Sequence, residues 1–420
     1  MNRLTYFLVA VIFACSPVKG TPLIDAEVLS IESMQIMPGS ASLRLGLDPP
    51  LALAVSASLS DGTTRDVTTY VTWSTSDQSV ASAPFGALTA LHSGSATITA
   101  TLGTAMATAQ VSVRDALIAV TTRSQQNVNG TIPQGILIYD AFASGSATAL
   151  RSIRGSGTTQ LGNPFGLAAD VSNNELFLVD QDTGVWVYPL DGNGSAVMPI
   201  RHIPTTTSSA PTLTRLQNMF GLRLVGDELY VVGEALGSNN TSFGAIAVYP
   251  RLGDGSNTQP FRLIGGSNSN IGAPQGMGIG SDVVYVANLV PGEVVAFPIN
   301  GDGDIAPTQV ITGSATQILE PIDIHVVGNE LFVGDLINGI LAFPLDAGSN
   351  TAPTRWIHGP DTQLSVPTAF AKVGETLVCG QLNTNAVTTD AIEATEDTPP
   401  VSTLSGSASS LVNPIGLTAF

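Results

Sequence analysis

Apolar and polar side chains alternate along short runs through most of this chain, and turn residues separate the runs. Between residues 28 and 113 the runs include LALAVSASL and SATITATL, with the turn pairs Asp61-Gly62 and Ser93-Gly94 between runs. Strict alternation turns one side of each run toward a core, which predicts β-strands. Several short strands at this spacing predict a small β-sandwich over residues 28–113.

From residue 116 onward, four short patterns recur in a fixed order. GILAFP at 339–344 recurs as GILIYD, VWVYPL, AIAVYP and EVVAFP, and ELFVGD at 330–335 recurs as ELFLVD, ELYVVG, VVYVAN and TLVCGQ. TRWIHG at 354–359 recurs as LRSIRG, FRLIGG and TQVITG, and a further motif opens a unit six times, as PFGLAA, MFGLRL, PQGMGI, PIDIHV, PTAFAK and PIGLTA. Four strands in every repeat of about 40 to 50 residues predict a β-propeller, here with six blades over 116–420.

The two ends of this repeat region complement each other. PIGLTA at 414–419 has the pattern of a first strand, with no partners after it in the repeat, whereas DALIAVTTR near residue 116 has the pattern of a second strand with no first strand before it. Pairing of these N- and C-terminal strands would complete one blade and remove two exposed sheet edges. The predicted fold class is therefore all-β, a sandwich followed by a propeller closed by its own ends.

Two stretches resemble known families. SDGTTRDVTTYVTWSTSDQSVAS followed by GALTALHSGSATITA resembles the bacterial immunoglobulin-like group 2 domain, in which a tryptophan at the position of Trp73 anchors the core. The succession P-x-G-L, L-Y-V-A-N and I-x-V-Y-P resembles NHL-type six-bladed propellers of exported bacterial proteins. The first resemblance implies a spacer or adhesive module; the second implies a fold that serves many functions.

The first residues, MNRLTYFLVAVIFACSPVKG, predict an export signal over 1–14, because the apolar run is too short to remain as a membrane span. The stretch Ile12-Phe13-Ala14-Cys15 resembles a bacterial lipobox, which implies acylation of Cys15, a lipidated tether over 15–27 and, from Ser16, sorting to the outer membrane or cell surface. Plain secretion or a periplasmic location stays open. The other cysteine, Cys379 in LVCGQL, is predicted to be buried apolar filler.

Charge excludes some partners. The formal net charge is −18, and lysine occurs only as Lys19 and Lys372. A phosphate backbone or an anionic lipid surface would be repelled, so we expect no nucleic-acid partner and membrane contact only through the lipid anchor.

The connections after the third strand of each unit are rich in Asp, Asn and Gly, as in LDGNGSAVMP, RLGDGSNTQP, INGDGDIAP and LDAGSNTAP. Their recurrence at one position favours turn chemistry, because these residues accept positive φ and local hydrogen bonds. INGDGDIAP also suggests calcium, but it lacks the glutamate that closes a calcium loop.

Polar residues recur where the second strand of each unit ends. They form a predicted ring near the channel mouth that consists of Thr121, Asp180, Gly233, Asn288, Asp335 and Gln381. One interpretation is that these side chains cap neighbouring strands or loops. The other is a ring that binds a ligand or cation.

A second candidate group lies on the first strands. Asp323 and His325 are two apart and therefore point to the same side, and Arg223 occupies the position of His325 in another blade. The three side chains are predicted to converge in the channel, either on an anionic or metal-bridged ligand or as a water-filled plug of paired charges.

The sequence has no nucleophile elbow, zinc-protease or phosphate-binding motif, so no catalytic residue is assigned. The preferred hypothesis is a monomeric, non-enzymatic binding or adhesion module for a glycan, peptide or protein of the cell envelope, using irregular segments such as 204–219 and 233–244. The alternative resembles gluconolactonase-like and paraoxonase-like propellers and implies a calcium-dependent lactonase or esterase. In that case Asp180, Asn288 and Asp335 would hold the calcium ion and His325 would act as base. A purely structural role is the third possibility, and no cofactor other than calcium is expected.

Overall fold

The computed structural model describes residues 30–420, with gaps at 128–129, 133, 155–158, 206–215 and 238–240. The predicted signal, Cys15 and the tether therefore lie outside the described residues, as do parts of the segments 204–219 and 233–244. The chain divides into two compact units, Met1–Asp115 and Ala116–Phe420. In the described part, all regular structure is β-strand except three short 3-10 helices, and no helix there is long and apolar enough to cross a membrane.

Residues 30–115, the described part of the first unit, form three small sheets. Their strand orders are β1-β4-β5, β2-β10-β9-β6 and β3-β8-β7. The elements are β1 (Ile31–Met37), β2 (Ser40–Arg44), β3 (Leu51–Ala52), β4 (Ala54–Leu59), β5 (Thr64–Asp66), β6 (Thr72–Thr75), β7 (Ala81–Ser82), η1 (Pro84–Gly86), β8 (Ala87–Ala90), β9 (Gly94–Leu102) and β10 (Ala105–Arg114).

The alternation in the sequence becomes alternation of burial in this unit. In β4 the side chains of Val55, Ala57 and Leu59 are buried while the residues between them are partly exposed. Ile98 on β9 and Val111 on β10 join the same core, against which Trp73 packs. The period-two pattern thus built strands with one apolar face each, as the sequence predicts.

The described residues of the second unit form six four-stranded antiparallel sheets. The first sheet, in spatial order, is β15 (Arg151–Arg154), β14 (Gly135–Asp140), β11 (Leu117–Thr122) and β36 (Pro414–Ala419). The other five follow the chain: β16 (Pro164–Asp170), β17 (Glu175–Asp180), β18 (Gly184–Pro189), β19 (Arg201–Pro204); β20 (Leu216–Val225), β21 (Glu228–Leu236), β22 (Ser242–Pro250), β23 (Arg262–Gly265); β24 (Pro274–Ile279), β25 (Val283–Asn288), β26 (Glu293–Pro298), β27 (Gln309–Ile311); β28 (Pro321–Val327), β29 (Glu330–Asp335), β30 (Gly339–Pro344), β31 (Arg355–Ile357); β32 (Pro367–Val373), β33 (Thr376–Gln381), β34 (Ala386–Ala391), β35 (Ser402–Leu404).

Smaller elements lie between and beside these sheets. They are the hairpin of β12 (Gln125–Asn127) and β13 (Gly130–Ile132), and the 3-10 helices η2 (Ser314–Thr316) and η3 (Pro360–Thr362).

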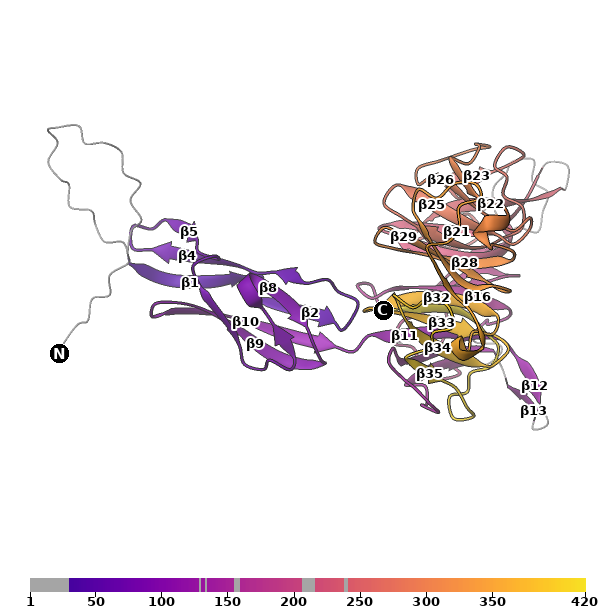
Figure 1. The fold of residues 1–420 in the computed structure, drawn as a ribbon. Coiled ribbons are helices and arrows are strands. Elements are labelled where there is room, and N and C mark those ends of the chain that lie inside the picture. Colours follow the sequence, from indigo (N-terminus) through magenta and orange to yellow (C-terminus); the bar gives the residue numbers. More distant parts are fainter. Residues whose placement is uncertain (1–29, 128–129, 133, 155–158, 206–215, 238–240) are drawn as a thin grey trace, which may run out of the picture. The chain divides into compact units, whose positions relative to one another are not determined.

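The first strands of the six sheets contact one another in a cycle. β16 contacts β20, and the contacts continue through β24, β28, β32 and β36, which in turn contacts β16. β36 also pairs antiparallel with β11, as the sequence predicts, so that the C-terminus lies beside the start of this unit (Figure 1). Thr121 Oγ1 accepts a hydrogen bond from the Gly416 N–H at 2.7 Å across this pairing. The cycle brings the loops at each end of the sheets onto two opposite faces.

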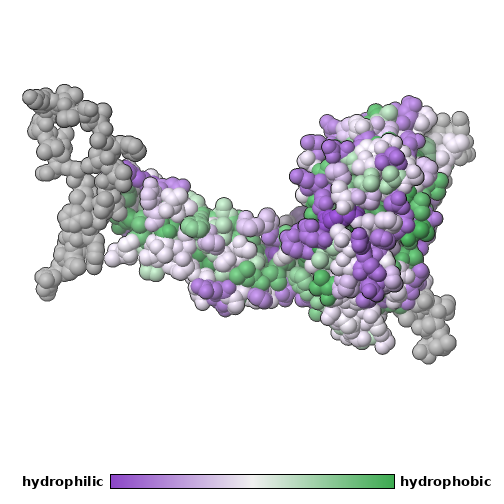
Figure 2. Space-filling model, in the orientation of Figure 1, coloured by the Kyte–Doolittle hydropathy of each residue, from purple (hydrophilic) through white to green (hydrophobic). Residues whose placement is uncertain are grey.

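Large apolar side chains fill the spaces between sheets. A buried aromatic ring occupies the same third-strand position in five sheets, namely Tyr139, Tyr188, Tyr249, Phe297 and Phe343. Hydrophilic residues cover much of the visible outer surface of this unit (Figure 2). The repeated third-strand motif therefore reflects the same packing arrangement between neighbouring sheets.

Candidate functional site

The ring of first strands encloses a small cavity on its axis. All six strands contribute to its lining, through residues that include Phe165, Phe220, Gln275, Asp323, Thr368 and Ile415. Its volume is about 40 Å³. A cavity of this size holds a few water molecules, whereas pockets for small-molecule ligands measure roughly 300–1,000 Å³. The axis is therefore closed to a substrate.

Arg223 and Asp323 meet inside this ring. Arg223 Nη2 lies 2.8 Å from Asp323 Oδ1 and also donates to the Ile324 carbonyl at 3.1 Å. Asp323 is 6% exposed, and its other oxygen accepts the Phe370 N–H at 3.3 Å. Burial raises the pKa of Asp323, and the charge of Arg223 opposes that rise. The pair joins β20 to β28 past the intervening β24.

Glycines on β24 make room for this pair. A Cβ on Gly276 would lie 2.5 Å from the Ile322 carbonyl oxygen and 2.7 Å from Asp323 Oδ1. The glycines of the PQGMGI motif thus let β28 and its charged side chain approach β24 closely. Asp323 in PIDIHV therefore fits its position because the preceding unit has a glycine, Gly276, opposite it.

His325 does not join the two charges around a ligand. It is partly buried, is not among the residues that line the axial cavity, and packs edge-on against the Phe370 ring at a centroid distance of 6.2 Å. Burial, reinforced by the positive charges of Arg223 and Lys372, lowers the pKa of His325 to about 3. A histidine that stays neutral throughout the physiological range and accepts protons this weakly is poorly matched to the predicted role of general base.

Asp180 and Asp335 both cap loops of their own sheets. Asp335 Oδ2 accepts the N–H groups of Leu319 and Glu320 at 2.7 and 2.8 Å, and Oδ1 accepts those of Ile337 and Asn338 at 3.0 and 2.9 Å. Each carboxylate therefore ties the loop before a first strand to the loop after the second strand.

Asp180 repeats this arrangement in the second sheet. It accepts the N–H groups of Gly162, Asn163 and Thr183 at 2.9, 2.6 and 3.1 Å. Both carboxylates are fully buried. Their hydrogen bonds place them in the capping role that the sequence left as one of two interpretations.

Asn288 performs the same task with an amide. Its Oδ1 accepts the Gly272 N–H at 3.2 Å, and its Nδ2 donates to the Asn270 carbonyl at 2.8 Å and to Glu293 Oε1 at 3.4 Å. Within the described residues, no three His, Cys, Asp or Glu side chains lie close enough together to hold a metal ion. Asp180, Asn288 and Asp335 thus bond to three separate loops and do not converge on one site.

The Asp-Gly and Asn-Gly connections have a role that the sequence did not reveal. Asn193, Asp254 and Asp302 each accept, through Oδ1, a backbone N–H from the fourth strand of the preceding sheet, at 3.0, 3.0 and 2.9 Å. The glycine that follows each of them donates its N–H to the same strand. These turns therefore join neighbouring sheets. The sequence signal for this role was the Asx-Gly pair that recurs at the same position of these units.

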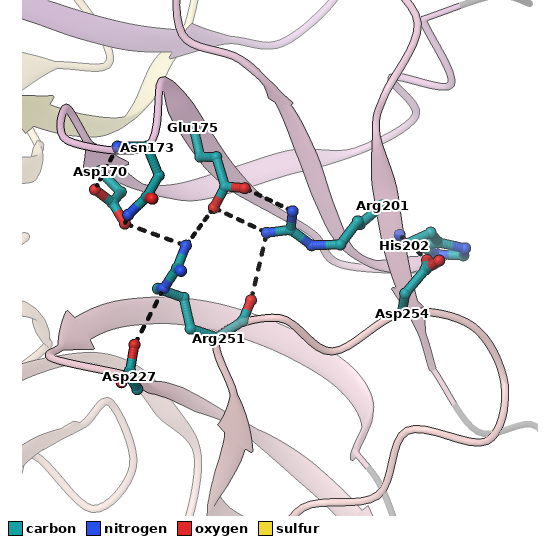
Figure 3. Close-up of polar contacts among 8 residues, drawn as sticks. All are labelled: Asp170, Asn173, Glu175, Arg201, His202, Asp227, Arg251 and Asp254. Atoms are coloured by element: carbon teal, nitrogen blue, oxygen red, sulfur yellow. Dashed lines mark hydrogen bonds and ion pairs between the residues drawn. The ribbon is translucent and has the colours of Figure 1, made fainter.

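A second unforeseen feature is a charge network between the second and third sheets (Figure 3). Arg201 makes two hydrogen bonds to Glu175, at 2.6 and 2.9 Å, and Arg251 Nη1 lies 2.7 Å from Glu175 and 3.3 Å from Asp170. The pairs Glu228–Arg262 and Glu330–Arg355 repeat the Glu175–Arg201 contact in other sheets. All three link the start of a second strand to the start of a fourth strand, so the network is a repeated structural element.

The sixth sheet departs from the other five. Asp390 on β34 stands at the position of the buried aromatic ring, in register with Leu377, and it is 1% exposed. On the same strand, Thr388 borders a pocket of about 350 Å³, which also touches Thr384 and the segment 360–365. This pocket opens where second strands turn into third strands and fourth strands lead to the next sheet, which we call the loop-rich face. The motif AVTTDA, where the other units have an apolar GILAFP pattern, was the sequence signal.

Asp390 makes the stability of the second unit depend on pH. Burial raises the pKa of Asp390 from the ordinary 3.8 to about 6. The folded state therefore binds a proton more tightly than the unfolded state, and stability falls as pH rises from about 4 to about 7. The ionised group costs about 3 kcal/mol at neutral pH.

We expect Asp390→Asn to be more stable than the parent chain at pH 7.5, with the difference shrinking to zero toward pH 4. Urea unfolding of both proteins at pH 4, 5, 6 and 7.5 measures this. Asparagine keeps an oxygen to accept the Thr388 hydroxyl hydrogen, so packing is matched. Parallel pH curves for the two proteins would contradict the assignment.

Comparisons with known proteins identify no family. No family model matches the chain, and no curated protein matches it. A solved structure entitled "Crystal structure of Nidogen/Laminin Complex" aligns with 72% of this chain and 98% of that chain, at 14% identity and a TM-score of 0.46. A computationally designed protein, Ika8, aligns with 71% of this chain and 90% of its own, at 11% identity and a TM-score of 0.40. Likenesses this distant carry no argument about the fold.

Proposed function

We propose that this chain is a non-enzymatic binding protein of the cell envelope, which takes its ligand on the loop-rich face of the second unit. In this proposal the second unit is a six-bladed NHL-like β-propeller and the first unit is a bacterial immunoglobulin-like spacer. The cyclic contacts of the six first strands and the pairing of β36 with β11 support the first assignment. The packing of Trp73 against the core of the first unit supports the second.

The contrast between the two cavities carries the functional proposal. The axial cavity has a volume of about 40 Å³ and contains an ion pair, whereas the pocket on the loop-rich face measures about 350 Å³. Only the latter reaches the size of ligand pockets. In this proposal the predicted signal and a lipid on Cys15 bring the chain to the cell envelope. Glycans, peptides and proteins of the envelope are the ligands to which such a module has access.

Binding is tested with the chain from Ser16 onward on parallel glycan and peptide arrays. Ala386 lines the pocket, so Ala386→Trp places a large ring in that space. Ser281→Trp, in an exposed turn between β24 and β25, is the matched control. We expect an array ligand that is retained by the control and lost with Ala386→Trp. Arrays on which both variants behave alike would contradict the proposal.

The absence of a catalytic calcium ion is a separate prediction. We expect thermal melting of the same protein to be unchanged by EDTA or by added calcium. Asp335→Ala should lower the free energy of unfolding by about 2–4 kcal/mol in every buffer, because four backbone N–H groups lose their acceptor. A calcium-dependent rise in melting temperature that both Asp335→Ala and Asn288→Ala remove would favour the hydrolase instead.

A further inference from the structure

The pocket on the loop-rich face exists because small residues replace large ones in the sixth sheet. Thr388 and Thr403 are paired across β34 and β35, as Leu341 and Trp356 are paired in the fifth sheet. Ser405, two residues after Thr403, stands where the fifth sheet has His358. There the Trp356 and His358 rings stack at 3.8 Å and fill the corresponding space. Exchange of two rings and a leucine for three hydroxyl side chains leaves the pocket of about 350 Å³.

The lining of the pocket is uncharged and rich in hydroxyl groups. Five of its side chains carry a hydroxyl: Ser365, Thr384, Thr388, Thr403 and Ser405. The other lining residues are the amide Gln363 and the apolar Pro360, Leu364 and Ala386. A charged ligand would be desolvated here without an opposite charge in the wall. A neutral ligand with many donors and acceptors, and some C–H surface for the apolar residues, matches this wall best.

A buried hydrogen-bond chain fixes Thr388 behind the pocket wall. The Ser365 N–H donates to Gln381 Oε1 at 2.8 Å, and Gln381 Nε2 donates to Thr388 Oγ1 at 3.1 Å. Thr388 Oγ1 in turn donates to Asp390 Oδ2 at 3.0 Å. Thr388 itself is 0% exposed, so this chain supports the pocket wall from behind, and the hydroxyls open to a ligand are those of Thr384, Thr403 and Ser405. Among the described residues, the second carboxylate oxygen, Asp390 Oδ1, has no hydrogen-bond partner.

The backbone beside the pocket is already paired, which argues against a peptide added as an extra strand. The outer edge of β35 is covered by Gly145 of the first sheet: the Gly145 N–H donates to Thr403 at 2.8 Å, and the Ser405 N–H donates to Gly145 at 2.8 Å. Strand addition needs free N–H and C=O groups along an edge. Recognition in this pocket must therefore come from side chains.

From these observations we infer that the pocket binds a neutral, polyhydroxylated ligand of the size of one sugar unit. The inference rests on the proposed binding function and deepens it. Thr384 and Ser405 would exchange hydrogen bonds with ligand hydroxyls, Thr403 would form the side wall, and Leu364 would contact a C–H face of the ring.

Saturation-transfer difference NMR tests the ligand class. The chain from Ser16 onward is mixed in turn with the methyl glycosides of glucose, galactose and mannose, and with N-acetylglucosamine. Glucuronic acid and glucosamine serve as the charged counterparts. We expect transfer to at least one neutral sugar, with the charged counterparts binding about tenfold more weakly because the wall lacks a counter-charge.

Variants assign the binding to the pocket. Thr384→Val with Thr403→Val removes two hydroxyls while keeping their shape, and we expect it to raise the Kd about tenfold. Ala386→Trp should abolish binding, whereas Ser281→Trp should not change it. No transfer to any neutral sugar, equal binding by the double valine variant, or tighter binding of a charged counterpart would each overturn the inference.

The inference can fail without the proposed function. If an array peptide is lost with Ala386→Trp while no sugar binds, the ligand class is wrong and the binding function stands. If no array ligand depends on Ala386, both fail together.

Discussion

Replacing Arg223 by alanine is expected to lower the free energy of unfolding of the second unit by about 3–5 kcal/mol. Arg223 Nη2 lies 2.8 Å from Asp323 Oδ1, and the Asp323 side chain is 8% exposed. Loss of the guanidinium leaves a carboxylate inside the ring with no opposite charge. Urea unfolding followed by tryptophan fluorescence measures the change, since Trp186 and Trp356 both lie in this unit.

A double variant separates the cost of an unpaired charge from the value of the pair. Arg223→Met with Asp323→Asn removes both charges and keeps an oxygen for the Phe370 N–H. We expect it to recover at least half of the stability lost in Arg223→Ala, because a buried ion pair contributes little net stability compared with neutral groups of similar volume. A double variant as unstable as the single one would show that the pair itself stabilises the ring.

Removal of Pro414–Phe420 is expected to abolish the cooperative unfolding transition of the second unit. This change deletes β36, exposes the edge of β11, and removes the buried Leu417 and Phe420. It also breaks the cycle of first strands between β32 and β16. Circular dichroism during heating measures the effect, and the transition of the first unit serves as an internal reference.

Restoration in trans is the control for this deletion. A synthetic peptide of residues 411–420 carries the missing strand, and we expect its addition to restore the transition at concentrations that saturate the gap. Gly416→Ala in the intact chain should act in the same direction as the deletion, because a Cβ there would lie 1.9 Å from the Phe165 carbonyl oxygen. A truncated chain that melts like the intact one would contradict the role of β36.

Much of the strand pattern was readable from the sequence because it depends on local chemistry. Alternation of apolar residues built the strands, and the unpartnered PIGLTA motif predicted the pairing of β36 with β11. The buried position of Cys379 followed from its register with Leu178, Val231, Val286 and Val333 of other units. Each of these depends on the side of a strand to which a residue points, and sequence spacing determines that side.

The candidate site was less predictable because it depends on distant partners. The capping of Asp335 requires the loop at residues 319–320, which no spacing rule places beside it. Arg223 and Asp323 are 100 residues apart, and only the cycle of first strands brings them together. The pocket beside Thr388 arises from an absence of bulk, and it becomes visible only once the register with Leu341 and Trp356 is known.

The pairing of β36 with β11 also determines when the first sheet can be completed during folding. Thr121 and Gly416, which hydrogen-bond across it, are 295 residues apart in the chain. During synthesis β11 is made early, but one of its edges stays unpaired until β36, the last strand of the chain, is available. Closing so long a loop is slow and leaves edges open in the meantime. A chain built this way relies on rapid pairing within each hairpin, or on a holding chaperone, to stay soluble until β36 pairs.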